Sequence, residues 1–189
     1  MDKDEVIPNS EEIFLELVSK MRTEKLPTHW DIKMHLWTKT MKNIFKKIGE
    51  SYGYFVPDIE WMKLDQIWVL SKEETDSIIV AIEHENKDSF KNILEDELQK
   101  LIDIKAYVKI LMFYDKKPSE KEIVEKIKDK IKTQKLIISG EKYLIILGIA
   151  HEDPDDPSFT DYIELRADEF DSEGNHKFIG KLKIRYVGL

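Results

Sequence analysis

The spacing of apolar residues in the first fifty positions predicts two helices. The first is expected over 11–22, with Ser10 as its capping residue. The second begins at the capping residue Thr28 and ends at Gly49. In the second helix, apolar residues at alternating spacings of four and three form one buried face: Trp30, Met34, Trp37, Met41, Ile44 and Ile48.

From residue 52 onward, short apolar runs alternate with helical patterns. We expect helices over 88–105 and 119–134, and strands over 52–61, 63–70, 78–86, 106–114 and 142–150. This order predicts an α/β fold in which helices cover both faces of a central mixed sheet.

The last forty residues have a different pattern. An acidic, proline-containing loop over 151–158 precedes two strand-like segments around a turn at 172–175. We therefore expect a single domain over 1–189, with its core at 28–150 and a C-terminal β extension at 151–189.

The net charge of −8 argues against a surface that is basic all over. A nucleic-acid partner would have to bind a local basic patch, because phosphate contacts dominate such affinity. The predicted second helix offers one beside its apolar face: Lys33, Lys39, Lys42, Lys46 and Lys47. The alternative is that these lysines form a solvated helix face.

The absence of cysteine excludes disulfides, thiolate zinc sites and a cysteine nucleophile. The acidic N-terminus lacks the apolar stretch of a signal peptide, and no segment approaches the roughly 18 apolar residues that span a bilayer. We therefore expect a cytoplasmic protein with no membrane partner.

The expected strand over 78–86 carries an apolar run, IIVAI, directly into charged residues. Because side chains alternate along a strand, Glu83, Glu85 and Lys87 are expected on one face and His84 on the other. Charge at the end of a buried strand needs a reason.

The strand before it supplies a further carboxylate. A hairpin of 63–70 and 78–86 that is symmetric about position 74 places Asp65 opposite Glu83. Like charges in that position destabilise a sheet and raise each other's pKa unless a cation lies between them. Oxygen ligands on a rigid sheet suit Mg²⁺ or Mn²⁺. The sequence thus predicts a divalent-metal site at Asp65, Glu83 and Glu85.

The pair KLDQIWVL and IIVAIEHENK resembles the motif of the PD-(D/E)xK nuclease superfamily, in which an Asp on one strand precedes a strand that ends in Glu-x-Lys. The resemblance implies a restriction-endonuclease-like fold and Mg²⁺-dependent hydrolysis of DNA, by a homodimer or with a partner subunit. It leaves open whether Glu83-x-Glu85 or Glu85-x-Lys87 is the working motif.

In the first register, the resemblance makes Asp65 and Glu83 metal ligands, places Glu85 where the family has its lysine, and makes Lys87 an auxiliary group. Glu50 is the candidate for the further acid that members often carry on the helix before the first strand. The literal Pro57-Asp58 lies outside the paired strands and is set aside.

Three readings compete with a nuclease that acts alone. The three carboxylates can be a solvated strand end, or the chain can be a catalytically silent binding module that keeps the fold. It can also be a subunit of a larger restriction or repair assembly in which a partner recognises the DNA. The lysine missing at position 85 and the negative net charge support the silent module.

Overall fold

The structure is a computed structural model that describes residues 7–24, 26, 34–58, 61, 63–73, 77–86, 89–115, 119–134, 139–152 and 160–185. The helices are α1 (Ser10–Thr23), α2 (Met34–Ser51), α3 (Phe90–Asn92), the π-helical turn η1 (Ile93–Glu97), α4 (Leu98–Asp103) and α5 (Glu120–Lys132). The strands are β1 (Gln66–Val69), β2 (Ile78–Glu85), β3 (Val108–Tyr114), β4 (Lys142–Glu152), β5 (Thr160–Asp171) and β6 (His176–Arg185).

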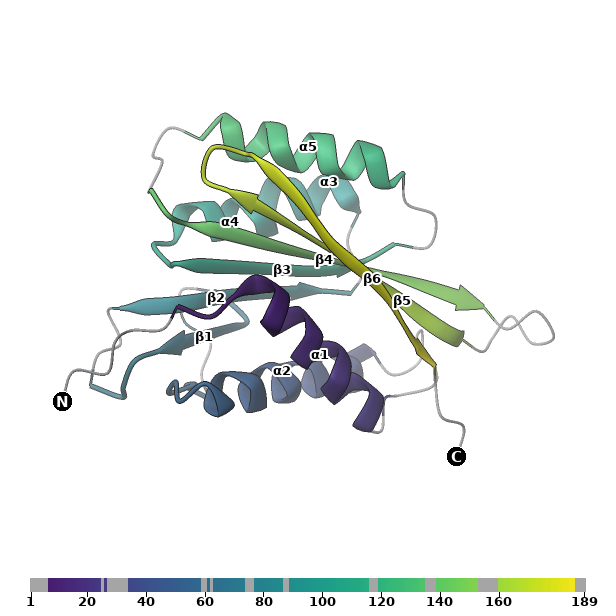
Figure 1. Cartoon of the computed structure of the whole chain (residues 1–189), viewed down its shortest axis with the longest axis horizontal. Coiled ribbons are helices and arrows are strands. Elements are labelled where there is room, and N and C mark those ends of the chain that lie inside the picture. The colour runs from purple at the N-terminus through teal and green to yellow at the C-terminus, as the bar shows by residue number, and fades with distance from the viewer. Residues whose placement is uncertain are drawn as a thin grey trace.

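The six strands form one mixed sheet in the order β1-β2-β3-β4-β5-β6 (Figure 1). Strands β2, β3 and β4 are parallel, whereas β1, β5 and β6 each run antiparallel to their neighbours. The predicted α/β class and mixed sheet are therefore confirmed. The C-terminal β extension consists of two further strands of the same sheet.

Helices cover both faces of the sheet, with α1 and α2 on one side and α3, α4 and α5 on the other (Figure 1). The apolar stripe of α2 forms part of the first core layer, where Trp37, Met41 and Ile48 are buried. On the opposite layer, Leu101 of α4 and Ile127 of α5 pack against the sheet. Among the described residues, no helix is long and apolar enough to cross a membrane.

Two predicted helix boundaries are wrong. The cap of α1 is Asn9, whose side chain accepts a hydrogen bond from the Glu11 backbone N–H at 2.8 Å, while Ser10 is buried as the first helical residue. Helix α2 continues past Gly49 to Ser51, because Gly49 serves packing and does not terminate the helix. A Cβ atom there would lie 2.8 Å from Val56 and 2.9 Å from the Trp68 ring. The predicted cap Thr28 lies outside the described residues.

The predicted strand over 52–61 is also wrong over its described part. Only Phe55 there forms a bridge with a named strand, pairing with Val69 of β1 through two backbone hydrogen bonds. The nearby Pro57 cannot donate to a ladder, which explains why the segment does not extend into a strand.

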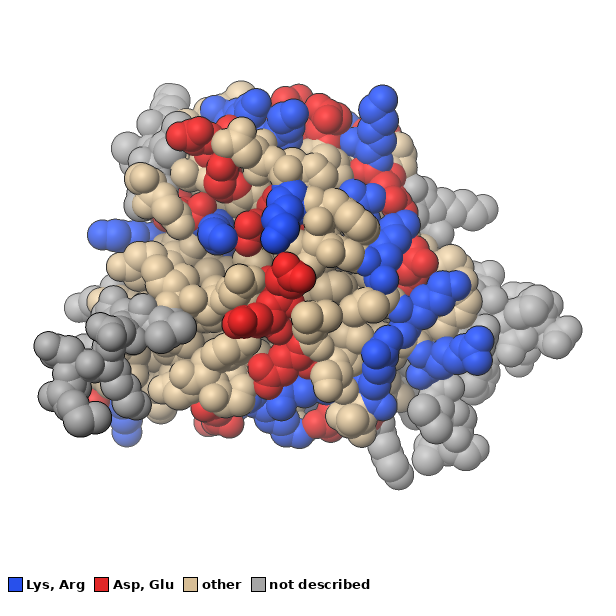
Figure 2. Space-filling model, viewed as in Figure 1, with Lys and Arg blue, Asp and Glu red and all other residues tan. Residues whose placement is uncertain are grey.

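Strand β6 is the exposed edge of the sheet and is rich in basic residues: Lys177, Lys181, Lys183 and Arg185. Figure 2 shows basic side chains along the course of β6 and acidic side chains nearer the middle of this face, over α1. Repulsion between such edges disfavours pairing of β6 with another chain.

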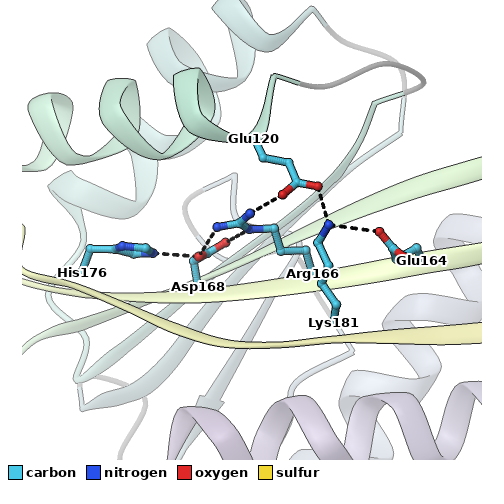
Figure 3. Close-up of polar contacts among 6 residues, drawn as sticks. All are labelled: Glu120, Glu164, Arg166, Asp168, His176 and Lys181. Atoms are coloured by element: carbon cyan, nitrogen blue, oxygen red, sulfur yellow. Dashed lines mark hydrogen bonds and ion pairs between the residues drawn. The ribbon is translucent and has the colours of Figure 1, made fainter.

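A polar network joins the N-terminal end of α5 to the β5–β6 hairpin (Figure 3). Its members are Glu120, Glu164, Arg166, Asp168, His176 and Lys181. The Glu120 carboxylate accepts hydrogen bonds from both Arg166 and Lys181, so one helix residue holds two strands. Arg166 also donates two hydrogen bonds to Asp168, at 2.5 and 2.8 Å. The network therefore fixes the hairpin against α5.

Candidate metal site and lysine-lined pocket

The β1–β2 hairpin brings Asp65 beside Glu83. Gln66 pairs with Ile82 and Trp68 with Val80, which is the predicted register symmetric about position 74, and a bulge follows Trp68. Asp65 directly precedes β1, and its Oδ2 accepts a hydrogen bond from the His84 backbone N–H at 2.9 Å. The Asp65 carboxylate is thus fixed at the end of β2.

Glu83 is buried between β2 and α4, with 3% of the residue exposed. Desolvation, followed by the charges of Asp65 and Glu97, raises the pKa of Glu83 from 4.5 to about 9. Within the described part of the chain, its Oε1 atom has no hydrogen-bond partner. The ammonium group of Lys100 lies near it, with Nζ 3.7 Å from that oxygen.

Lys100 and Glu97 come from the helix that follows β2, and sequence reasoning missed both. The Lys100 Nζ atom donates a hydrogen bond to Glu97 Oε2 at 2.6 Å. Burial lowers the pKa of Lys100, but the hydrogen bond to Glu97 and the charge of Glu83 outweigh it, so that the pKa is raised overall. The available signal was the three-residue spacing of Glu97 and Lys100, which places both on one helix face.

A π-helical turn positions these two residues. The Leu98 backbone N–H bonds to the carbonyl of Ile93, five residues back. Ile93, Leu98 and Leu101 are all buried, so the core-facing side of the helix contains a step of five residues. The predicted helix over 88–105 is therefore present but irregular, because a regular α-helix repeats every 3.6 residues.

His84 faces the opposite side of the sheet, as the strand alternation predicts. It is buried, and its Nε2 lies 3.2 Å from the Tyr114 hydroxyl, which in turn accepts a hydrogen bond from Trp37 Nε1 at 2.8 Å. Burial lowers the pKa of His84 to about 4, so the ring is neutral at physiological pH. Its role in the fold is to pack β2 against α2.

Part of the predicted basic face of α2 lines a pocket of about 370 Å³ that also contains Asp65. The lining residues are Lys39, Lys42, Asn43, Lys46, Pro57, Asp58, Asp65 and Gln66. Lys42 Nζ lies 2.9 Å from Asp65 Oδ1, and Lys46 Nζ lies 2.5 Å from Asp58 Oδ1. The Asp65 carboxylate therefore connects the pocket to the end of β2.

The remaining predicted residues lie elsewhere. Glu50 is exposed on α2 and lies 4.0 Å from Lys46, one turn earlier. Glu85 is partly buried and accepts a hydrogen bond from the Asn86 backbone N–H at 2.7 Å. Lys47 forms an ion pair with Glu24, near the end of α1. Lys33 and Lys87 fall outside the described residues.

The described residues contain no group of three or more His, Asp or Glu side chains arranged so as to hold a metal ion. Asp65 and Glu83 are adjacent, but Lys42 pairs with Asp65, whereas Lys100 lies 3.7 Å from Glu83. The metal site thus stays a prediction.

Comparisons with protein-family models, with curated proteins and with solved structures gave no match. What this site does must therefore be inferred from its side chains and their geometry.

Proposed function

We propose that this protein is a metal-dependent phosphodiesterase that acts on DNA, of the PD-(D/E)xK type with a restriction-endonuclease-like fold. The observation that carries the proposal is Glu83, a buried carboxylate with an unpartnered oxygen, beside the carboxylate of Asp65. The element order supports it, because a helix precedes the hairpin that carries both acids, and a crossover helix then leads to the parallel strand β3.

The donor atoms fit a hard divalent cation. Asp65, Glu83 and Glu85 offer only oxygen ligands, and within the described part of the chain Glu83 Oε1 has no donor or cation in hydrogen-bonding contact. In the proposed site Asp65 and Glu83 hold Mg²⁺ or Mn²⁺, and Glu85 completes the site. The bound metal would lower the pKa of a water molecule and neutralise charge that develops on the phosphate.

The lysine-lined pocket suits a backbone phosphate of DNA. Lys39, Lys42 and Lys46 line it, and Lys42 contacts the Asp65 carboxylate directly, so a phosphate in the pocket would lie next to the proposed metal ligands. In this proposal Lys33 and Lys47 extend the basic face, Lys87 orients the attacking water or the phosphate, and Glu50 is the fourth acid. The proposal also places the protein in the cytoplasm, where it would meet DNA.

The test is a titration of Mn²⁺ into wild-type protein and the Asp65→Asn variant by calorimetry, followed by plasmid cleavage with the same samples. We expect wild type to bind Mn²⁺ and nick the plasmid, and the variant to lose most of both activities, because one charged ligand is removed. Cleavage by both proteins at the same rate would remove Asp65 from the mechanism.

A silent binding module is the second candidate, and one observation favours it. Lys42 pairs with Asp65, and the raised pKa of Glu83 favours its neutral acid form, so the fold does not depend on a metal for charge balance. Mn²⁺ binding without cleavage of plasmid, linear or single-stranded DNA would favour this module. A partner subunit or a homodimer would then be sought by light scattering.

A further inference from the structure

The helix after β2 adds an acid and a cation to the candidate site. We propose that Glu97 is a further ligand of the divalent cation and that Lys100 occupies the cation's place when the cation is absent. This inference rests on the proposed metal-dependent function and concerns two residues that the strand motif does not include.

The Lys100 ammonium group lies between two carboxylates. Its Nζ lies 3.7 Å from Glu83 Oε1 and 2.6 Å from Glu97 Oε2, so one positive charge lies between two carboxylates. The contact with Glu83 is too long for a hydrogen bond and leaves that buried oxygen unpartnered within the described structure. Lys100 therefore lies close to Glu83 without making a hydrogen bond to it.

The charges gathered at this site favour a divalent cation. Three carboxylates, from Asp65, Glu83 and Glu97, act on one another here. Among the described residues, the cations in contact with them are Lys42 and Lys100. A divalent ion carries twice the charge of an ammonium group and binds carboxylate oxygens directly. It would give a partner to Glu83 Oε1, which has none among the described residues.

The two carboxylates and the lysine differ in their exposure to solvent. The Glu83 side chain is 5% exposed and the Glu97 side chain 14%, whereas the Lys100 side chain is 33% exposed. The long lysine side chain can therefore turn its ammonium group into solvent while the two carboxylates stay in place. That movement would open the space between them to a cation and leave Lys100 free to contact a phosphate.

The helix after β2 contains a π-helical turn that ends at Glu97. Such turns are rare in proteins and occur frequently at functional sites. Here the turn adds a residue between the buried Ile93 and Leu98. Glu97, the last residue of the turn, and Lys100, three residues later, therefore lie over the end of β2. The irregular backbone thus delivers both side chains to Glu83 while the core stays packed.

The experiment measures Mn²⁺ affinity by calorimetry for wild type, Glu97→Gln, Lys100→Met and the control Glu95→Gln. Glu95 is on the same helix, but its side chain is 59% exposed and pairs with Lys91, away from the site. Glutamine keeps the shape of glutamate and removes its charge, and circular dichroism verifies that each variant is folded. The same samples are then tested for plasmid cleavage.

We expect Glu97→Gln to raise the Kd for Mn²⁺ by about tenfold or more. The control Glu95→Gln should leave the Kd unchanged, and Lys100→Met should bind Mn²⁺ no more weakly than wild type. Equal affinity in Glu97→Gln and wild type would overturn the inference, as would an equal loss in Glu95→Gln or weaker binding by Lys100→Met. If wild type binds Mn²⁺ but cleaves no DNA, the nuclease proposal fails, and the affinities still decide the role of Glu97. Absence of binding by wild type would overturn both.

Discussion

Glu83 is a carboxylic acid that the fold keeps away from water. It lies at the end of an apolar strand, under α4, where desolvation and the charges of Asp65 and Glu97 favour its protonated form. A residue selected for stability alone would be apolar at this position, or both of its side-chain oxygens would be hydrogen-bonded. A buried acid with a strongly shifted pKa is typical of functional sites.

The raised pKa of Glu83 predicts a specific dependence of stability on pH. Between its unfolded pKa of 4.5 and its folded pKa of about 9, the folded protein binds more protons than the unfolded chain. The contribution of Glu83 to the free energy of unfolding therefore falls as pH rises through this window and levels off above it.

Replacing Glu83 with Gln removes that contribution. Compared with wild type, Glu83→Gln should gain stability as the pH rises from 5 to 8, by up to about 1.4 kcal/mol per pH unit. Urea unfolding of both proteins at several pH values measures the difference. A difference that stays constant over this range would show that Glu83 titrates normally in the folded state.

Residues of the strands were predictable from the sequence, because alternation and hairpin symmetry are strong local rules. They placed Asp65 beside Glu83 and put His84 on the other face. The role of Gly49 was not predictable, because it depends on the approach of Val56 and Trp68 from other parts of the chain. A glycine near the end of a helical pattern looks the same whether it ends the helix or makes room for a neighbour.

At the scale of elements, the helix between β2 and β3 was predictable in position but not in detail. Its apolar pattern over 88–105 indicated a helix, yet the π-helical turn depends on how Ile93 and Leu98 both reach the core. For this reason the sequence did not assign Glu97 and Lys100 to the candidate site. The strand over 52–61 failed for the opposite reason, because its aromatic residues favour a strand, but over its described part only Phe55 bridges to β1.

Strands β3 and β4 also bury an ion pair that stabilises their joint packing. Lys109 of β3 is fully buried and donates hydrogen bonds to Glu141 Oε2 at 2.7 Å and to the Tyr143 hydroxyl at 3.2 Å. Burial lowers the pKa of Lys109, and the hydrogen bond to Glu141 opposes that effect. Removal of one partner leaves the other as an uncompensated buried charge.

We predict that Lys109→Met lowers the free energy of unfolding by about 3–5 kcal/mol. The double variant with Glu141→Leu should recover most of that loss, because it replaces both charges with apolar groups. Urea unfolding at constant pH measures the two changes. A double variant as unstable as the single one would mean that the pair contributes specific stabilisation beyond charge balance.

At the scale of the whole molecule, basic residues gather in two places on a protein of negative net charge. The chain carries a net charge of −8, yet three lysines line the pocket on α2 and four basic residues lie on β6. A mixed sheet covered by helices on both faces followed from the alternation of helix and strand patterns. Which charged residues meet in space did not, because it depends on contacts between distant segments, such as that of Lys42 with Asp65.

The measurement that tests the central claim most directly is cleavage of supercoiled plasmid in Mn²⁺ by wild type and by Glu83→Gln, at equal concentrations of folded protein. The account predicts that wild type nicks the plasmid, that a chelator stops it, and that the variant loses at least about a hundredfold in rate, as expected when transition-state charge stabilisation is removed. Equal rates for the two proteins, or cleavage that persists in the chelator, would contradict a metal site at Glu83.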